Sequence, residues 1–390
     1  MPVRSTTPRG LDALLAQEFP LAEDLVYLNH AAVSPWPNRT SEAVIRFAQE
    51  NTRQGARNYT EWTVMERNLR QQCAKMLNTS AENLAFAKNT SEALSFVASG
   101  FPWEAGDNVV IPSGEFPSNR VVWESLQSRG VSVRQIPLGN TREPEELLLR
   151  AFDSRTRLLS VSSVQYATGL RLDLERLGAA CKQAGAAFCV DAIQGLGALP
   201  HDVSAMDIDF LAADAHKWLL GPEGIALFYC SPVWRERLVL HEYGWHMLEA
   251  AHDYERVDWQ PANSARRFEP GSPNMLGIHA LSSSLSLIEE TGIDIIESRI
   301  LQRSEYLFEF FAGDSAFHVV TPASKGRYAG IVTIRHERVD AAKLHAGLRE
   351  HNIVCAARGG GIRFSPHFYT AFAKIDRAVE ALRDVAARAV

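Results

Sequence analysis

Between residues 84 and 230, short runs of apolar and β-branched residues alternate with longer segments whose apolar residues recur every three or four positions. The short runs are typical of buried strands, and the longer spacing is typical of amphipathic helices. This alternation predicts a mainly parallel sheet with helices on both faces. Seven strands are expected, at residues 84–89, 108–112, 131–137, 157–164, 186–192, 209–214 and 224–230.

The segments between the strands predict helices at residues 91–100, 117–130 and 173–185, each ending at a glycine, as helices commonly do. The pattern changes after about residue 278. We expect a helix over residues 280–312, a strand near 329–337, a helix at 340–352, a strand near 352–357 and a last amphipathic helix at 370–390. The sequence therefore predicts a helical segment at residues 1–20, a large α/β domain at 21–278 and a smaller α+β domain at 279–390.

Composition narrows the class of protein. The chain has 390 residues, of which 46% are hydrophobic, as in a globular protein with a large core. A net charge of −6 without a basic tract argues against nucleic-acid binding, and no apolar stretch approaches the roughly 20 residues of a membrane span. The five cysteines contain no C-x-x-C pair. We expect a cytoplasmic protein with reduced thiols, no membrane partner and no metal site.

Polar residues follow two of the predicted strands, where ligands bind in open α/β sheets. Asp191 and Gln194 follow one strand, and His216 and Lys217 follow the next. A carboxylate and an ammonium there could form a plain ion pair. The alternative is a site for pyridoxal phosphate (PLP), in which a lysine forms a Schiff base and an acidic residue pairs with the protonated pyridine nitrogen. Burial would help Lys217 lose its proton and act as a nucleophile.

A phosphate-binding position is predicted where the strand at 84–89 meets the following helix. The free N–H groups of the first helical turn, near Thr90 and Ser91, form an anion site together with the helix dipole. The same segment could be an ordinary helix start, with Asn89 or Thr90 as the N-cap. The combination with Asp191 and Lys217 favours the phosphate.

Six motifs together resemble the class V aminotransferase group of the fold type I PLP enzymes. That group includes cysteine desulfurases, kynureninase, isopenicillin N epimerase-like proteins and several C–S lyases. The resemblance covers nearly the whole chain and implies a PLP cofactor and a homodimer whose active site is shared between subunits. The motifs are "YLNHAAVSP" (27–35), "NTSEAL" (89–94), "VDAIQGLG" (190–197), "ADAHKWLLGPEG" (213–224), "RRFEPGSPN" (266–274) and "GIRFSPHFYT" (361–370).

The resemblance assigns roles to the residues around the cofactor. It makes Lys217 the Schiff-base lysine, Asp191 the partner of the pyridine nitrogen, and Gln194 a hydrogen-bond donor to the phenolic oxygen of the ring. Thr90 and Ser91 match the phosphate loop. These five positions form the core of the expected site.

Three further positions match cofactor-binding residues of the family. His216, next to the lysine, matches a further phosphate-binding residue, and Ser272 matches a hydroxyl residue that reaches the phosphate from the second subunit. Phe116 matches the aromatic residue stacked on the cofactor ring, where desulfurases have a histidine. A phenylalanine can stack but cannot exchange protons.

Substrate binding is expected at Arg363, Asn29 and His30. Arg363 matches the arginine that binds the substrate α-carboxylate, a task that suits a bidentate guanidinium, although by itself it could be a surface arginine. Asn29 and His30 resemble the segment lining the substrate entrance. His30 could equally be a satisfied polar residue in a turn.

Two departures from the desulfurase pattern are visible. Asp214 stands where desulfurases often have a phosphate-binding serine, and a carboxylate would repel a phosphate. The asparagine that desulfurases place near the ring oxygen is missing from residues 162–169, where Gln165 or Tyr166 could replace it. Asp214 is therefore not expected to bind the phosphate.

The same cofactor supports transamination, epimerisation, β-elimination and desulfuration. A desulfurase needs a thiol on a mobile loop before the carboxylate-binding arginine, but Cys355 lies in an apolar run typical of a buried strand. We expect a class V aminotransferase-type enzyme that performs transamination or related chemistry at Cα or Cβ, with Lys217 as acid and base. The alternatives are a C–S lyase or desulfurase-like elimination, an epimerase, and a non-catalytic PLP-fold binding module. Buried charges at Lys217, Asp191 and Arg363 argue against the last.

Overall fold

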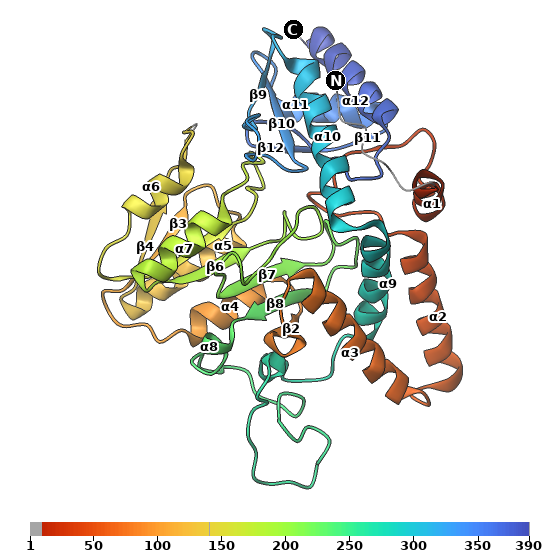
Figure 1. Cartoon of the computed structure of the whole chain (residues 1–390). Coiled ribbons are helices and arrows are strands. Elements are labelled where there is room, and N and C mark those ends of the chain that lie inside the picture. The colour runs from red at the N-terminus through yellow and green to blue at the C-terminus, as the bar shows by residue number, and fades with distance from the viewer. Residues whose placement is uncertain (1–9, 140, 390) are drawn as a thin grey trace.

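The structure is a computed structural model that describes residues 10–139 and 141–389. A large unit is built on a seven-stranded sheet, and a smaller unit stands above it in Figure 1. The strand order in the large sheet is β2-β8-β7-β6-β5-β3-β4. The strands are β2 Leu84–Ala87, β3 Asn108–Pro112, β4 Ser132–Ile136, β5 Thr156–Ser162, β6 Ala187–Asp191, β7 Phe210–Asp214 and β8 Ala226–Cys230.

The sheet is mainly parallel. Strands β4, β3, β5, β6 and β7 run parallel to one another, whereas β8 is antiparallel to both β7 and β2. All seven predicted strands are present, and β3 has the predicted bounds. The predicted α/β fold is therefore confirmed.

Helices cover both faces of this sheet, so alternate residues of each central strand enter two separate cores. In β6, Phe188 and Val190 belong to one core, while Ala187 and Cys189 belong to the other. This double burial explains why the strands are continuous apolar runs. The helices of the large unit are α2 Asn38–Gln54, α3 Tyr59–Met76, α4 Thr90–Gly100, α5 Ser118–Glu124, α6 Pro144–Arg150, α7 Leu174–Ala184, α8 Pro232–Arg235 and α9 Met275–Thr291.

The predicted helix over residues 280–312 is in fact two helices. Helix α9 ends at Thr291 and α10 (Ile293–Phe311) begins after Gly292, whose φ of 84° is in the left-handed region that glycine adopts without strain. The segment predicted as one helix at 117–130 is also divided, into α5 and a 3₁₀ turn at Ser125–Arg129.

The smaller unit contains a four-stranded antiparallel sheet of order β12-β13-β10-β9. A two-residue strand from the other end of the chain, β1 Val26–Tyr27, pairs in parallel with β11, and Val26 and Leu28 pack in the core of this unit. The N-terminal segment therefore contributes to both units. The elements are β9 Phe317–Val319, β10 Val332–His336, α11 Ala341–Glu350, β11 Ile353–Val354, β12 Ala356–Arg358, β13 Gly361–Phe364 and α12 Phe372–Ala389.

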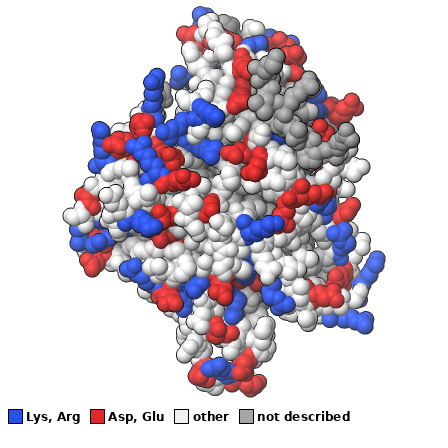
Figure 2. Space-filling view, viewed as in Figure 1, with Lys and Arg blue, Asp and Glu red and all other residues white. Residues whose placement is uncertain are grey.

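Helix α1 (Leu11–Glu18) lies within the predicted helical segment 1–20, of which residues 1–9 are outside the described part. Figure 2 shows basic and acidic side chains interspersed over the visible face, without a large patch of one sign. Among the described residues, no helix combines the length and the apolar character that a bilayer-crossing segment needs. The boundaries of the three predicted domains remain predictions.

Candidate active site

The carboxyl ends of neighbouring strands bring the candidate residues to one edge of the sheet. Asp191 is the last residue of β6, and Lys217 follows the end of β7 by three residues. Ser162, at the end of β5, is directly in register with Asp191. Parallel pairing therefore places side chains from three strands in one region, as the sequence predicts.

Lys217 is a buried amine without a charged partner in contact. Within the described residues no acidic side chain forms an ion pair with its Nζ, which lies 5.7 Å from the centre of the Phe116 ring. Burial lowers the pKa of Lys217 to about 8; the charge of Arg363 also lowers it, whereas Asp191 raises it. The amine therefore loses its proton at a lower pH than an exposed lysine does.

Asp191 is equally buried, and its environment disfavours its charge. Burial raises the pKa of its carboxyl to about 7, with a further increase from the nearby Glu115 and a decrease from Lys217. Its Oδ1 accepts a hydrogen bond from the N–H of Ile193 at 3.1 Å, whereas Oδ2 has no partner among the described residues. One carboxylate oxygen is therefore available to a ligand.

Phe116 leaves an aromatic face uncovered beside Lys217. Its side chain is 42% exposed and meets Tyr166 edge-on, with ring centres 5.1 Å apart. A large exposed aromatic next to a buried amine suits a planar ligand that stacks on it. Together, the unpaired amine, the free Oδ2 of Asp191 and this ring fit PLP.

The predicted phosphate position is partly occupied by a carboxylate. Helix α4 begins at Thr90, whose N–H donates to Asp214 Oδ2 at 3.0 Å, while the N–H of Asp214 donates to Thr90 Oγ1 at 3.1 Å. The N–H of Ser91 has no partner among the described residues, and its hydroxyl donates to Ser118. His216 Nδ1 is buried without a hydrogen bond, 3.8 Å from Asp214 Oδ1. Ser91 and His216 thus retain free donor groups, whereas Thr90 is engaged by Asp214.

Gln194 is held firmly by its neighbours. Its Nε2 donates to the carbonyl of Ala31, and its Oε1 accepts from Trp218 Nε1, both at 3.0 Å. Trp218 follows Lys217 directly and is fully buried. The amide orientation is therefore set by both contacts, and Nε2 keeps a second hydrogen for a ligand.

Arg363, on β13, is only 3% exposed, so it is not a surface arginine. Its Nη1 donates to the carbonyl of Tyr166 at 2.8 Å, and its buried Nε has no hydrogen-bond partner among the described residues. Burial lowers the pKa of this guanidinium to about 10. Unsatisfied donors on a buried cation favour an anionic ligand such as a carboxylate.

Asn29 and His30 differ in what they offer. Asn29 Oδ1 is buried without a hydrogen bond. His30 uses both ring nitrogens, because Nδ1 lies 2.8 Å from the carbonyl of Ser365 and Nε2 lies 2.7 Å from the hydroxyl of Tyr369. A carbonyl only accepts, so Nδ1 carries the proton and Nε2 accepts. Burial lowers the pKa of His30 to about 4, so the ring is neutral.

Ser272 is exposed and lines a cavity of about 300 Å³ whose walls include none of Lys217, Asp191 and Arg363. Within one chain, Ser272 is therefore not brought to the lysine.

Sequence reasoning missed Glu115, which lies in the loop after β3 and is buried. Its Oε1 accepts hydrogen bonds from the N–H of Ser162 and from Gln165 Nε2, each at 2.8 Å. Its Oε2 accepts from the hydroxyl of Ser162. Burial raises the pKa of Glu115, whereas these hydrogen bonds lower it. Asp191 was found by looking for carboxylates at or just beyond the ends of predicted strands. The same rule could have found Glu115.

Cys355 is buried between β11 and β12, and burial raises the pKa of its thiol to about 12. Strands β12 and β13 are joined by Gly359 and Gly360 alone, with φ values of 60° and 74°. Two consecutive left-handed residues form the tightest kind of hairpin connection. The hairpin therefore leaves no loop before Arg363 on which a thiol could move. All five cysteines are buried.

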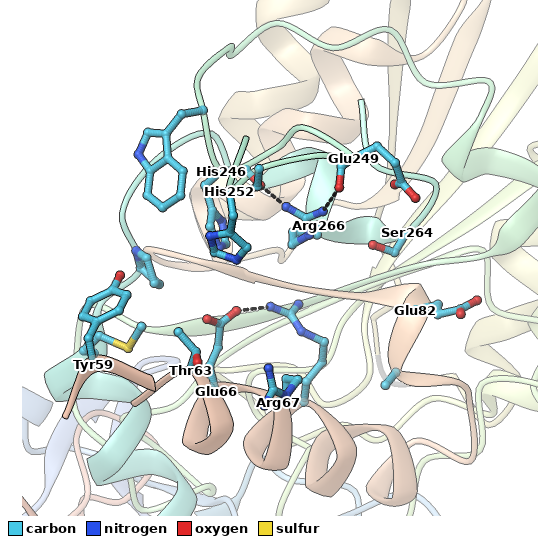
Figure 3. Close-up of a pocket in the computed structure, with 16 residues that line it drawn as sticks. Tyr59, Thr63, Glu66, Arg67, Glu82, His246, Glu249, His252, Ser264 and Arg266 are labelled. Carbon is cyan, nitrogen blue, oxygen red and sulfur yellow. Dashed lines mark hydrogen bonds and ion pairs between the residues drawn. The ribbon is translucent and has the colours of Figure 1, made fainter. Parts of the chain in front are cut away.

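A second charged cluster lies beside a cavity of about 350 Å³ (Figure 3). Arg70 on α3 pairs with Glu66 at 2.7 Å and with Glu269 at 2.6 Å, and His246 Nδ1 lies 3.7 Å from Glu269. Glu66, His246 and Glu269 have a spacing that a metal ion could bridge, but Arg70 already supplies positive charge to both carboxylates. The cluster anchors Glu269, and with it the segment that carries Ser272.

Comparisons with known proteins identify the family of this chain and support its fold. The family model "Aminotransferase class-V" matches residues 26–377. A probable cysteine desulfurase of Methanothermobacter thermautotrophicus is 29% identical over 95% of this chain and 97% of its own length. The crystal structure of the cysteine desulfurase CsdA from Escherichia coli superposes with a TM-score of 0.87 at 24% identity, covering 97% of this chain and 99% of that one. The cystine C–S lyase C-DES, solved with cysteine persulfide, superposes with a TM-score of 0.85 at 24% identity, covering 94% and 99%.

Proposed function

The chain belongs to the class V aminotransferase family of PLP-dependent enzymes, and from this premise we propose that Lys217 binds the cofactor covalently and moves the Cα proton of an amino-acid substrate. The observation that carries this proposal is the buried Lys217 amine without an ion-pair partner among the described residues. Burial lowers the pKa of this amine to about 8, so a much larger fraction of it is neutral near neutral pH than for an exposed lysine, and this neutral form is the nucleophile and proton acceptor.

The surrounding residues have complementary tasks in this proposal. Bound PLP withdraws electrons from the bonds at Cα, which makes the Cα proton acidic. Asp191 Oδ2 binds the pyridine nitrogen, Phe116 covers one face of the ring, and the second hydrogen of Gln194 Nε2 serves the ring oxygen. Ser91 and His216 contribute donors to the phosphate.

Arg363 binds the substrate carboxylate with the donors that the protein leaves free. Asn29, whose Oδ1 is also without a partner, contributes a polar contact beside it. His30 has a supporting role, because both of its nitrogens hold the segment of Asn29 against the C-terminal part of the chain. Substrate therefore binds between the two units.

For the reaction, we propose elimination at Cβ of a sulfur-containing amino acid. Relatives are named cysteine desulfurase, and a structural neighbour is named a cystine C–S lyase. The tight β12–β13 hairpin and the buried, weakly acidic Cys355 speak against transfer of sulfur to a protein thiol. In the proposed step the Cα proton passes to Lys217, the Cβ–S bond breaks with its electron pair going to sulfur, and hydrolysis of the remainder yields pyruvate and ammonia.

A homodimer is part of the proposal. Residues 241–264 form a loop that projects from the large unit at the lower edge of Figure 1. The loop carries exposed large apolar side chains at Tyr243, Tyr254, Val257 and Trp259, with Val257 91% exposed. Exposed apolar groups on a projecting segment are typical of a protein–protein contact. A partner covering this loop would also receive Ser272 near its own phosphate.

The test has two parts. The purified protein should show a visible PLP band that Lys217→Ala abolishes and that Lys182→Ala, at an exposed lysine, retains. Incubation with L-cysteine and cystine should release pyruvate and ammonia together with sulfide or persulfide. Conversion of PLP to its pyridoxamine form without pyruvate would instead show transamination, loss of optical activity alone would show epimerisation, and a protein that binds no PLP would refute the proposal.

A further inference from the structure

Glu115 is a buried carboxylate that the proposed reaction leaves without a task. It lies at the same edge of the sheet as Asp191, because its partner Ser162 is directly in register with Asp191. Few residues are costlier to bury than glutamate, and a chain keeps such a group when it is paired or when it acts. Within the described residues Glu115 forms no ion pair, so its burial needs a reason.

The hydrogen bonds to Glu115 show which form of the carboxyl they favour. At Oε1 the donors are the backbone N–H of Ser162 and the Nε2 of Gln165, both at 2.8 Å. N–H groups can only donate, so this oxygen acts as an acceptor of two bonds. Such contacts stabilise the ionised carboxylate against the cost of burial.

The same contact determines the orientation of Gln165. Because Nε2 faces Glu115, the amide oxygen Oε1 points elsewhere, and it has no hydrogen-bond partner among the described residues. Gln165 precedes Tyr166, whose carbonyl binds Arg363 and whose ring contacts Phe116. The free acceptor therefore belongs to the same group of side chains as the candidate site.

We propose that Glu115 is a positioning residue of the Lys217 site, which fixes the Gln165 amide through its nitrogen and places a second negative charge beside Asp191. The role in catalysis rests on the proposed function, whereas the coupling to Asp191 does not. Glu115 thereby raises the pH at which Asp191 loses its proton, and it presents Gln165 Oε1 as a hydrogen-bond acceptor for a ligand.

The size of the charge effect follows from the groups around Asp191. Glu115 and Asp214 are the negative groups that face it, and Lys217 is the positive one. At an effective dielectric constant of about 20, one unit charge shifts the titration of another by roughly two pH units at a separation of about 6 Å and by roughly one at about 12 Å. Removing the charge of Glu115 should therefore lower the pH at which Asp191 ionises by roughly one to two units.

The decisive experiment is a double-mutant cycle on the full-length protein without cofactor. Stabilities of the unmodified chain, Glu115→Gln, Asp191→Asn and the double variant are measured by urea unfolding from pH 4 to pH 8. The coupling between the two sites should be small below about pH 5, where Asp191 is protonated, and should grow as pH rises through 7, where both groups carry charge. A coupling that is absent or independent of pH would overturn the proposal, because a purely structural role does not follow ionisation.

A matched control is available in Glu145, another fully buried glutamate, which pairs with Arg327 away from this edge. The cycle of Glu145→Gln with Asp191→Asn should show no pH-dependent coupling. If Glu115→Gln does not fold, Glu115→Met replaces it in the cycle, because it also removes the charge and should show the same pH-dependent coupling to Asp191→Asn. Glu115→Asp keeps the charge and should show little coupling, and strong pH-dependent coupling in that variant would count against the proposal.

Cofactor-loaded protein gives a second readout. In Glu115→Gln, the pH midpoint of the visible PLP band should fall by roughly one to two units, because a negative charge that favours the protonated form is lost. Glu145→Gln should leave the midpoint unchanged. An unshifted midpoint in Glu115→Gln would overturn the role toward the cofactor. A protein without any PLP band would refute the proposed function, while the cofactor-free cycle would still decide whether Glu115 and Asp191 are coupled.

Discussion

Replacement of Arg363 by alanine tests the proposed mode of substrate binding. The side chain is buried, one of its nitrogens donates to the carbonyl of Tyr166, and its Nε has no hydrogen-bond partner within the described part of the chain. The truncation removes the donors that are free for a substrate carboxylate. Folding loses one hydrogen bond, a cost of about 1 kcal/mol, so the variant should remain folded.

The expected effect on turnover can be worked out from the number of free donors. A carboxylate bound by two charge-assisted hydrogen bonds gains about 1.5–3 kcal/mol from each. Loss of both therefore costs about 3–6 kcal/mol, which corresponds to a decrease of roughly 10²–10⁴-fold in kcat/KM. Most of the change should be a higher KM, because the carboxylate does not take part in bond breaking.

The assay compares an amino acid with its decarboxylated amine in both proteins. The unmodified protein should prefer the amino acid strongly, and Arg363→Ala should lose that preference. Arg358→Ala is the control, because this exposed arginine lies on the neighbouring strand β12. If Arg363→Ala keeps the preference, or if the unmodified protein turns over the amine equally well, Arg363 does not bind the carboxylate.

Three further predictions follow from the geometry. The cofactor-free protein should gain stability between about pH 8 and pH 10.5, because Lys217 is deprotonated in the folded state while the unfolded chain still holds the proton. Urea unfolding should show this rise in stability. A rise that persists in Lys217→Met would contradict the assignment to Lys217. Cys355→Ala should keep turnover within about twofold and lose about 1 kcal/mol of stability. Mass spectrometry should find no persulfide on the unmodified protein after turnover. A large loss of activity in Cys355→Ala would instead support transfer of sulfur to the Cys355 thiol. Gly359→Ala should lower the melting temperature more than Gly360→Ala. Both residues have positive φ, but only at Gly359 would a Cβ meet the backbone, 2.6 Å from the carbonyl oxygen of Ala167. Equal effects would show that backbone strain at positive φ alone determines the loss.

The large sheet could be predicted from the sequence because its central strands are buried on both faces. Continuous apolar runs ending in polar residues mark both the strand and the edge at which ligands bind, which is why Lys217 and Asp191 were found together. The break between α9 and α10 was missed, because apolar periodicity continues on both sides of Gly292 and a single glycine is tolerated within helices. Helix α2 was not predicted, since its described buried residues are only Thr40 and Ala43.

Contacts between distant segments were beyond sequence reasoning. The carboxylate of Asp214 was expected to conflict with a phosphate at this position, yet the structure uses it to bind the N–H of Thr90 at the start of α4. Likewise, the hydrogen-bond partners of Glu115 lie 47 and 50 residues away in the sequence, and no local pattern predicts these contacts. Which end of an amide faces a site depends on such contacts.

The short strand β1 has a consequence for how the protein is made. Its partner β11, and the Ser365 carbonyl that accepts a hydrogen bond from His30 335 residues earlier in the chain, are synthesised long after β1. Until these segments have been made, Val26 and Leu28 have no core to pack into, and both apolar side chains stay exposed on the nascent chain. Chaperone binding to this stretch, and damage to folding from stalling late in translation, would be the signs of that delay.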